Sequence, residues 1–355
     1  MSRTAVSGLP SRTALFRQTS PVRRAARGAF ALALCALLTF AANVQPAVAA
    51  PSADALLTAI VGINADIPGD ARTAALIGTH REGSGVVVSE DGLVLTIGYL
   101  ILEASRIEIE LQSGRKVPAD IVAYDHDSGF GLVRALEPLG LPALEFGDSD
   151  ALTVSRQALI ATRLGAAQAR GVYIVSRREF AGSWEYLIDN AIFTAPPHPN
   201  FSGAALLGVD GRLLGIGSLF VGDAAILNQP LPGNMFVPIG ELTPVYASLV
   251  ADGRRPGTPR SWLGLYPSAV HGRVFVDRLA KDGPAELAGL EPGDLIVAVG
   301  DTPVDAVAGF FRAMWASGHA GDTIMLGVLS RSGTVRQVPI VSIDRMKWLR
   351  LDSSL

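Results

Sequence analysis

A serine in a turn of small residues is the first feature that could do chemistry. The stretch HPNFSGAALLG, residues 198 to 208, places Ser202 between Phe201 and Gly203, just before an apolar, strand-like run. A serine hydroxyl is a poor nucleophile until a neighbouring base takes its proton, and histidine suits this task because its pKa lies near neutrality. The chemistry open to Ser202 therefore depends on the side chains that the fold brings to it.

Two histidines could reach Ser202 as a base. His198 lies four residues before the serine, and His126 lies in an earlier loop. The alternative interpretation is that both are solvent-facing loop residues. His126 also stands between Asp125 and Asp127, but three consecutive side chains rarely converge on one ion. We therefore expect no metal and no cofactor. The remaining histidines are His80, His271 and His319.

Short strands must position these residues. Between about residues 83 and 250 the chain reads as apolar or alternating runs such as GVVVSEDGLVLTIG, RIEIELQSG and ALLGVDGRLLGIG. The segments EDG, QSGR and VDGR are typical of hairpin turns. Many short strands with almost no helical period predict an all-β barrel or sandwich.

A second module follows a linker. ADGRRPGTPR, residues 251 to 260, is rich in Gly, Pro and charge, as linkers are. Beyond it the runs WLGLYP, RVFVDRL, LIVAVG, IMLGVL and VRQVPIV predict strands, and VDAVAGFFRAMWASG predicts a helix with Asp305 as its N-cap. The pattern predicts a compact α+β module.

The N-terminus has the pattern of an export signal. The first 49 residues contain six arginines and no acid, followed by an apolar run and AVAA. We expect a signal peptide over residues 1–49, cleaved near Ala49, and a periplasmic or secreted protein. Removal of the six arginines changes the formal charge from −3 to −9, which argues against nucleic-acid partners. Cys35, the only cysteine, lies in the leader, so the mature chain has no disulfide.

The two modules together resemble HtrA-type (Do-like) bacterial serine proteases. WLGL at 262 to 265 and GPAELAGLEPGDLIVAVGDTPV at 283 to 304 resemble the PDZ domain of that family. GSGVVVSEDGLVLTIGYLI, LEFGDSDALTVSRQALIATRLG and FSGAALLGVDGRLLGIG resemble its protease domain. The resemblance implies a mostly β fold, a chymotrypsin-like double β-barrel followed by a small α+β PDZ domain. It places the protease-like domain at 50–250, the linker at 251–260 and the PDZ domain at 261–345.

The positions that match the catalytic triad are degenerate. Ser202 matches the nucleophile, but Tyr99 stands where the family has histidine and Gly129 where it has aspartate. Tyrosine, with an ordinary pKa near 10, is a base in only about one molecule in a thousand at pH 7. The oxyanion hole would be formed by Asn200 and Ser202, and Asn200 replaces the family's glycine. These departures predict a pseudoprotease.

The PDZ-like module has the residue types that peptide binding by a PDZ domain needs. Such domains bind a C-terminal peptide as an added strand, with the carboxylate on backbone N–H groups of a Gly-containing loop. The corresponding residues are Trp262, Leu263, Gly264, Leu265, Val307, Phe311 and Met314. The alternative is that they are ordinary core residues. The family resemblance also implies a trimer formed through an aromatic N-terminal segment, but residues 51 to 78 contain no aromatic residue.

Three functional hypotheses follow. In the first, the protein is an inactive protease homologue that binds polypeptide C-termini or unfolded envelope proteins, as a scaffold or chaperone-like quality-control factor. In the second, it is an active serine endopeptidase whose rearranged triad uses Ser202 with His198 or His126. In the third, it is a stable exported β-protein with no retained binding function.

Overall fold

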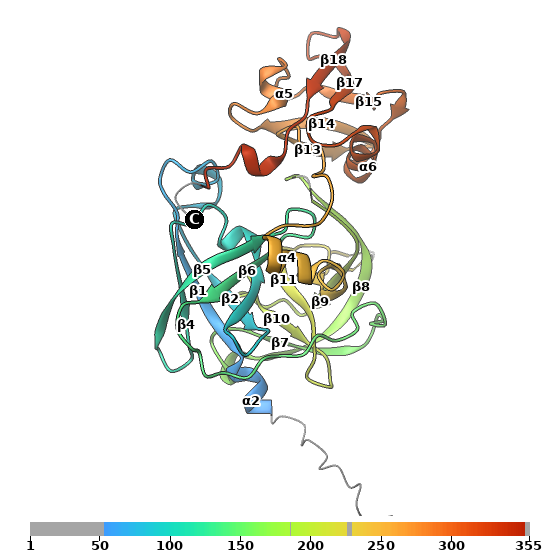
Figure 1. Ribbon diagram of the computed structural model, residues 1–355. Helices are drawn as coiled ribbons and strands as arrows, with labels where there is room; N and C mark the ends of the chain where they lie inside the picture. Colours follow the sequence, from blue (N-terminus) through green and yellow to red (C-terminus); the bar gives the residue numbers. More distant parts are fainter. Residues whose placement is uncertain (1–52, 185, 226–228, 352–355) are drawn as a thin grey trace, which may run out of the picture. The chain divides into compact units, whose positions relative to one another are not determined.

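A computed structural model describes residues 53–184, 186–225 and 229–351. The expected signal peptide, including Cys35, lies outside the described residues. Contacts group Pro51–Leu355 into one unit, which contains two barrels and a C-terminal sheet (Figure 1). Within the described part of the chain, no helix is both long enough and apolar enough to cross a membrane.

The first barrel carries the loops that hold Tyr99 and Gly129. Its strands are β1 (Ile60–Asp66), β2 (His80–Val87), β3 (Leu93–Ile97), β4 (Arg106–Glu110), β5 (Lys116–Tyr124) and β6 (Phe130–Ala135). They close in the order β1-β2-β3-β6-β5-β4, each antiparallel to its neighbours. The alternating RIEIE sequence of β4 buries its isoleucines in the barrel and leaves one face wetter, as predicted. β1 extends the barrel beyond the region in which strands were predicted.

The second barrel carries Ser202. Its strands are β7 (Gln157–Ala161), β8 (Arg170–Gly182), β9 (Tyr186–Ala195), β10 (Ala205–Leu207), β11 (Leu213–Val221) and β12 (Gly233–Pro238). They close in the order β10-β11-β12-β9-β8-β7. β8 and β9 form a long hairpin, and Ser202 lies in the loop that joins β9 to β10. Short helices flank the barrels: α2 (Ala53–Thr58), α3 (Ala74–Ile77), η1 (Gly98–Leu100), η2 (Ala166–Gln168), η3 (Ile239–Glu241) and α4 (Tyr246–Asp252).

The C-terminal module is a small sheet with two helices. Its strands β13 (Leu265–Val270), β14 (Arg273–Leu279), β15 (Leu295–Val299), β17 (Thr323–Leu329) and β18 (Val335–Val341) are ordered β13-β14-β15-β17-β18, and β16 (Thr302–Pro303) pairs with β15. Its helices are α5 (Pro284–Leu287), α6 (Val307–Ser317) and the 3₁₀ turn η4 (Arg345–Lys347). The N-cap of α6 is Ala306 without a side-chain cap, so the prediction of Asp305 was wrong by one position.

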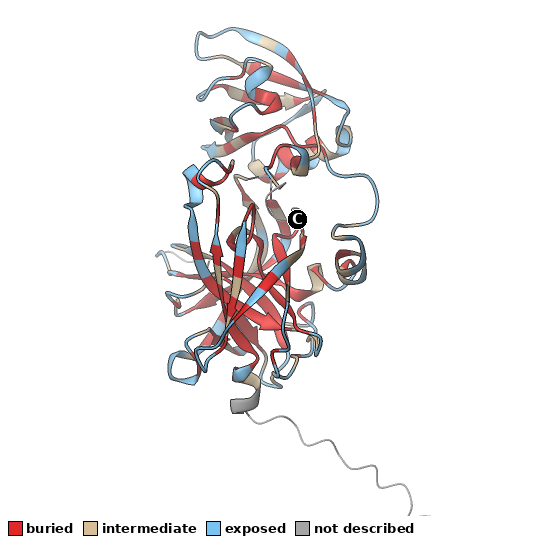
Figure 2. Cartoon of the chain, turned by 60° about the vertical axis from the view of Figure 1, so that its left-hand side comes forward, coloured by how far each residue is buried: buried red, intermediate tan, exposed pale blue. Residues whose placement is uncertain are grey.

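Burial follows the strands of each barrel. Figure 2 shows buried residues concentrated on the barrel strands and on the C-terminal sheet, with exposed residues in the turns. The largest core cluster joins both barrels, and a separate cluster fills the C-terminal module around Phe310, Phe311 and Met314. The predicted fold class, a mostly β chain with a double barrel and a small α+β domain, is confirmed.

Candidate functional site: a serine held by a tyrosine

Ser202 is fixed by its backbone between the two barrels. Its carbonyl oxygen accepts a 2.8 Å hydrogen bond from the N–H of Ser84 on β2. The next residue, Gly203, has φ +70°, and a Cβ there would overlap the carbonyl oxygen of Ser84. Only glycine combines this backbone conformation with this close approach. The small residues that follow Ser202 thus hold the serine at the barrel junction.

Tyr99 contacts Ser202 directly. Its hydroxyl oxygen lies 2.9 Å from Ser202 Oγ and 3.0 Å from the carbonyl oxygen of Ser218 on β11. A tyrosine hydroxyl has one proton, and a carbonyl oxygen can only accept. Both contacts are hydrogen bonds when Tyr99 donates to Ser218 and the Ser202 hydroxyl donates to Tyr99. If Tyr99 donates to Ser202 instead, the serine proton has no base among these groups.

The phenol of Tyr99 is a weak base in this site. Burial raises its pKa to about 12, and the hydrogen bond with Ser202 only partly opposes that shift. Tyrosinate is therefore even rarer near neutrality than for a free tyrosine, by about a hundredfold. The hydrogen-bond chain from Ser202 through Tyr99 ends on a backbone carbonyl, which cannot accept a proton at this pH.

A buried ion network positions the turn that carries Tyr99. Arg81 is 5% exposed and donates to the carbonyl oxygens of Tyr99 and Leu102, both at 2.8 Å. Burial lowers the pKa of Arg81 to about 10, and the nearby Glu103 carboxylate opposes that shift. Glu103 is fully buried and accepts from the backbone and hydroxyl of Thr73 at 2.8 and 2.7 Å. Sequence patterns did not indicate either residue, because neither belongs to a catalytic motif.

Gly129 lies beside the turn that carries Tyr99. Its carbonyl oxygen accepts from the N–H of Gly98 at 2.7 Å. Gly129 has φ +82°, and a Cβ would lie 2.8 Å from Cε2 of Tyr186. Tyr186 is 2% exposed, and burial raises its pKa well above its usual value. An aromatic ring thus crowds the position where an orienting carboxylate would stand.

His198 is committed to backbone contacts. It is 1% exposed, and its Nε2 lies 2.9 Å from the carbonyl oxygen of Gln168, to which it must donate. Its Nδ1 therefore accepts, from the N–H of Asn200 at 3.1 Å. Neither ring nitrogen is left to take a proton from Ser202. The expected loop exposure of His198 was wrong, because the residue is enclosed by its own turn.

The same contact removes a donor from the oxyanion position. Asn200 stands where the resemblance places the glycine of the oxyanion hole, and its N–H points to His198 instead. Asn200 is also absent from the described residues with positive φ, the conformation in which glycine is favoured. Ser202 and Asn200 lie in one loop, but the N–H of Asn200 donates a hydrogen bond to His198.

His126 lies away from Ser202. Its Nε2 is 2.7 Å from Met346 Sδ, its Nδ1 is buried without a partner among the described residues, and its ring packs edge-on against Tyr124. Burial, and then the charge of Arg345, holds the pKa of His126 well below 6.5, so the ring is neutral. The expected loop exposure of His126 was therefore also wrong.

The carboxylates beside His126 belong to ion pairs. Asp125 accepts from Arg255 through both oxygens at 2.6 and 2.8 Å, and Asp127 lies 3.2 Å from Arg260 Nε. Arginine therefore occupies the oxygens that a metal would need. No group of three potential metal ligands occurs among the described residues.

A cavity of about 500 Å³ opens above Tyr99 and Ser202. Its walls are mostly apolar, with the side chains of Ile97, Leu100, Leu102, Trp184, Phe201 and Leu219 among them. Tyr186 and Arg345 also line it, from the β8–β9 hairpin and from η4. Ser202 and Tyr99 thus border a mostly apolar space, and no sequence pattern indicated the wall residues Tyr186 and Arg345.

The seven predicted peptide-binding residues lie in one region of the C-terminal module. Gly264 has φ +72°, and its carbonyl oxygen accepts from the N–H of Ala280 at 2.7 Å. Leu263, Leu265, Phe311 and Met314 are at most 1% exposed and pack in the module core, and Val307 is half-buried. Trp262 is buried against Trp348, with ring centroids 4.9 Å apart. β13 is the terminal strand of the sheet, beside α6.

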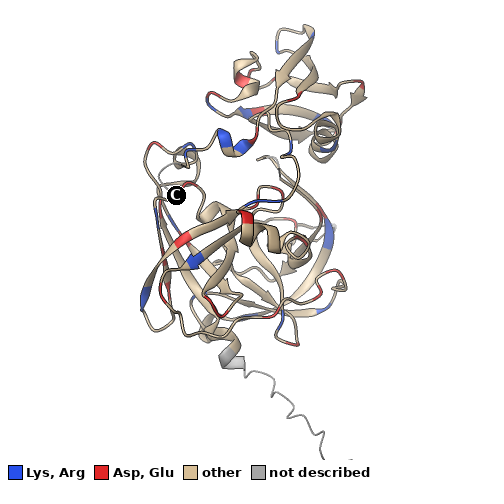
Figure 3. Ribbon diagram, viewed as in Figure 1, with Lys and Arg blue, Asp and Glu red and all other residues tan. Residues whose placement is uncertain are grey.

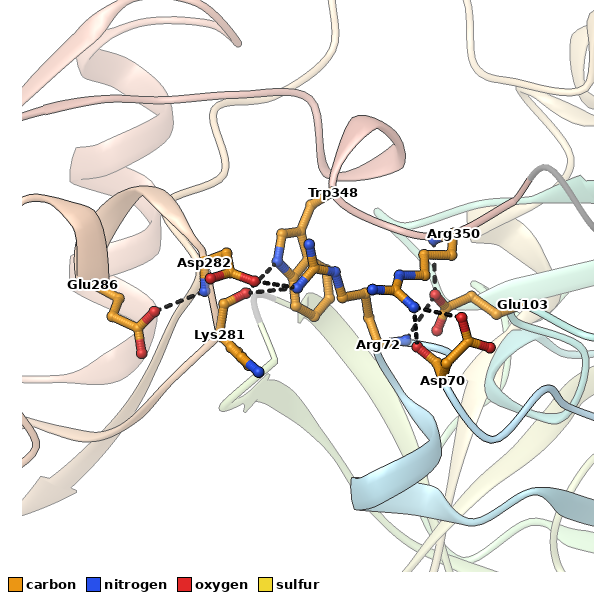
Figure 4. A network of polar contacts seen from close by, with 8 residues as sticks. All are labelled: Asp70, Arg72, Glu103, Lys281, Asp282, Glu286, Trp348 and Arg350. Atoms are coloured by element: carbon orange, nitrogen blue, oxygen red, sulfur yellow. Dashed lines mark hydrogen bonds and ion pairs between the residues drawn. The ribbon is translucent and has the colours of Figure 1, made fainter.

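The segment after β18 returns to the first barrel. Figure 4 shows Trp348 and Arg350 of this segment between the turn at Lys281 and Asp282 and the residues around Glu103. Trp348 Nε1 donates to the carbonyl oxygen of Lys281 at 2.9 Å, and the N–H of Arg350 donates to Glu103 at 2.8 Å. The same carboxylate that supports the Tyr99 turn therefore also holds the C-terminal segment.

Family models match both modules. Residues 83–216 match the trypsin-like peptidase domain, and residues 261–341 match the PDZ domain. With the double barrel and the C-terminal sheet, these matches indicate a domain similar to trypsin-like peptidases, followed by one PDZ domain.

Individual relatives are named as proteases. Periplasmic serine endoprotease DegP of Escherichia coli (strain K12) is 28% identical over 291 residues, 77% of this chain and 59% of that protein. A probable periplasmic serine protease do/HhoA-like of Haemophilus influenzae is 32% identical over 285 residues, with the same coverages of 77% and 59%. The chain spans little more than half the length of these curated relatives. The solved HtrA-type protease AlgW with decapeptide is 20% identical, with a TM-score of 0.50 over 84% of this chain and 98% of that one, which supports the fold.

Proposed function

We propose that this HtrA/DegP-like protein does not hydrolyse peptides and acts by binding polypeptide segments through its PDZ domain. The observation that carries the first part is the contact of Ser202 with Tyr99, whose hydrogen-bond chain ends on the carbonyl of Ser218. Three further observations support it: Gly129 supplies no carboxylate, the N–H of Asn200 bonds to His198, and His126 lies against Met346.

Peptide binding is supported by the loop and strand that the PDZ match contains. The left-handed conformation of Gly264 gives the loop before β13 the turn that a carboxylate-binding loop needs. β13 ends the sheet, so its outer edge can accept an added peptide strand. Val307 is half-buried and has more accessible surface than the other apolar residues predicted for the groove. Those residues are buried: Leu263, Leu265, Phe311 and Met314.

We propose an exported, periplasmic location, because the arginine-rich apolar N-terminus has the pattern of a signal peptide and relatives are named periplasmic. Its clients would then be unfolded envelope proteins or their C-termini.

The test uses the chain without its leader. A fluorescent peptide with an apolar C-terminal residue should bind, and its C-terminally amidated form should bind at least about tenfold more weakly, because the amide lacks the carboxylate charge. Casein incubated with the same sample should remain intact. Casein cleavage that is lost in Ser202→Ala would refute the non-hydrolytic function, and equal affinity for both peptides would refute carboxylate recognition.

A second candidate function is peptide hydrolysis. The retained Ser202 and the names of the relatives favour it. It would require His198 to leave the carbonyl oxygen of Gln168 and the N–H of Asn200, and then to displace Tyr99 from Ser202. His126 would have to leave a partly buried position against Met346.

A further inference from the structure

We propose that the cavity above Ser202 binds a small monocarboxylate with a hydrocarbon body, and that Arg345 receives its carboxylate. Tyr266 of β13 lines this cavity, but most of the lining comes from the barrels, and the proposal does not depend on peptide binding by the PDZ domain.

Arg345 is a buried cation without an anionic partner. It is 9% exposed and lines the cavity, and Nη1 donates to the carbonyl oxygen of Trp184 at 2.9 Å. Its Nε is buried without a hydrogen-bond partner, and no carboxylate of the described residues forms an ion pair with it. A buried charge without a partner is costly, so an anion at this wall would be stabilised.

A half-buried and a buried arginine of the protein show the usual arrangement. Arg255 pairs with Asp125 through two hydrogen bonds, and Arg81 has four oxygen acceptors with Glu103 close by. Figure 3 shows η4, which contains Arg345 and Lys347, as a cationic turn in the C-terminal segment. Arg345 thus differs from these arginines in lacking a carboxylate.

The other charged groups at the cavity are already paired. At its rim His80 contacts Asp66 and Glu82 at 3.0 and 3.1 Å, and Glu82 also pairs with Arg163 at 2.5 Å. Arg81 donates four hydrogen bonds to protein oxygens. The Tyr186 hydroxyl on the wall is close enough to the Ser218 side chain for a hydrogen bond. The uncommitted donor of the cavity therefore belongs to Arg345, whose guanidinium suits a carboxylate oxygen.

The remaining walls suit a hydrocarbon. The volume of about 500 Å³ lies within the range of about 300 to 1,000 Å³ found for small-ligand sites, and the lining is dominated by aliphatic and aromatic side chains. A peptide would bring an N–H and a C=O for each residue, and these would need partners. Tyr99, Ser202 and Arg81 already use their hydrogen bonds within the protein. A free alkyl carboxylate has a single polar end and makes no such demand.

The test is calorimetric titration of the full two-domain chain with decanoate and with 1-decanol, which has the same chain without the charge. We expect decanoate to bind at least about tenfold more tightly, because only the anion compensates Arg345. Arg345→Gln should weaken decanoate at least about tenfold and leave decanol within about twofold. Arg350→Gln, which removes a cation of the same segment outside the cavity, should change neither.

A second variant tests the hydrocarbon part of the site. Leu219→Trp fills the cavity from β11 and should abolish binding of both ligands, while circular dichroism shows whether the variant folds. Three results would each overturn the proposal. They are equal affinity for decanoate and decanol, an equal effect of the two arginine substitutions, and unchanged binding in a folded Leu219→Trp variant. The proposal would also be overturned if decanoate did not bind and a C-terminal peptide bound at Arg345 instead, because the cavity would then be a peptide site.

Discussion

The hydroxyl oxygen of Tyr99 lies 2.9 Å from Ser202 Oγ, and the family resemblance implies a histidine at the position of this tyrosine. The phenol reproduces the contact but not the chemistry, because its oxygen carries a proton at neutral pH and its pKa is raised to about 12 by burial. Tyr99 therefore gives Ser202 a hydrogen-bond partner that is a poor base near neutral pH.

Alkaline titration should reveal the environment of Tyr99. A folded-state pKa of about 12 exceeds the ordinary value of 10, so the protonated phenol stabilises the fold below pH 10, and this contribution is lost as pH rises toward 12. Tyrosinate absorbance should show a late-titrating group that is absent from Tyr99→Phe. If Tyr99→Phe leaves the titration above pH 11 unchanged, the phenol is not buried against Ser202 as described.

Restoring the triad aspartate should destabilise the fold. Gly129→Asp places a Cβ 2.8 Å from the Tyr186 ring at φ +82°, which we expect to cost about 2 to 4 kcal/mol of unfolding free energy. Gly114→Asp is the matched control, since Gly114 has φ +84° and nothing within 4 Å, and should cost about 1 kcal/mol. Equal losses in urea unfolding would show that Tyr186 does not crowd this position.

The Glu103 carboxylate should contribute to the stability of the fold. Glu103→Gln replaces one oxygen acceptor by an amide donor that faces either the N–H groups of Arg72 and Arg350 or the N–H and hydroxyl of Thr73, and leaves Arg81 without a nearby charge. We expect a loss of about 2 to 4 kcal/mol in unfolding free energy. Glu90→Gln, at an exposed position, should change it by less than about 0.5 kcal/mol. A near-neutral Glu103→Gln would contradict the role of this carboxylate.

The PDZ loop should tolerate no side chain at Gly264. A Cβ there would lie 3.0 Å from Trp262 and 3.1 Å from Ala280 at φ +72°, so Gly264→Leu should distort the loop and weaken peptide binding at least about tenfold. Gly272→Leu has a similar φ of +69° but open space, and should leave the affinity within about twofold. Fluorescence anisotropy with the peptide described above measures both, and equal affinities would exclude the Gly264 loop from the binding site.

Motif order and strand patterns were sufficient to predict the fold. The hairpin signals and the run AGLEPGD placed two modules in sequence, and both were confirmed by the barrels and family matches. β1 was missed because the run IVGINAD stands apart from the other strands in sequence and pairs with β4, which lies far along the chain. Long-range pairing of this kind has no local signal.

The residues of the candidate site were indicated by sequence motifs, but their contacts were not. The motifs indicated Tyr99, Gly129, Asn200 and Ser202, and in the structure Tyr99 contacts Ser202 while the N–H of Asn200 contacts His198. The acceptor of Tyr99 is a backbone carbonyl, which any residue could supply. The hydrogen bond from Asn200 to His198 and the unpaired Nε of Arg345 could not be predicted, because they depend on how side chains pack in the folded chain.

Covalent labelling of Ser202 tests the central claim most directly. A fluorophosphonate probe reacts with an activated serine and can be located by peptide mass spectrometry, with trypsin labelled in parallel as the positive control. We predict no adduct at Ser202 under conditions that label trypsin fully, since the serine proton has no base. An adduct at Ser202 that disappears in Ser202→Ala would contradict the account.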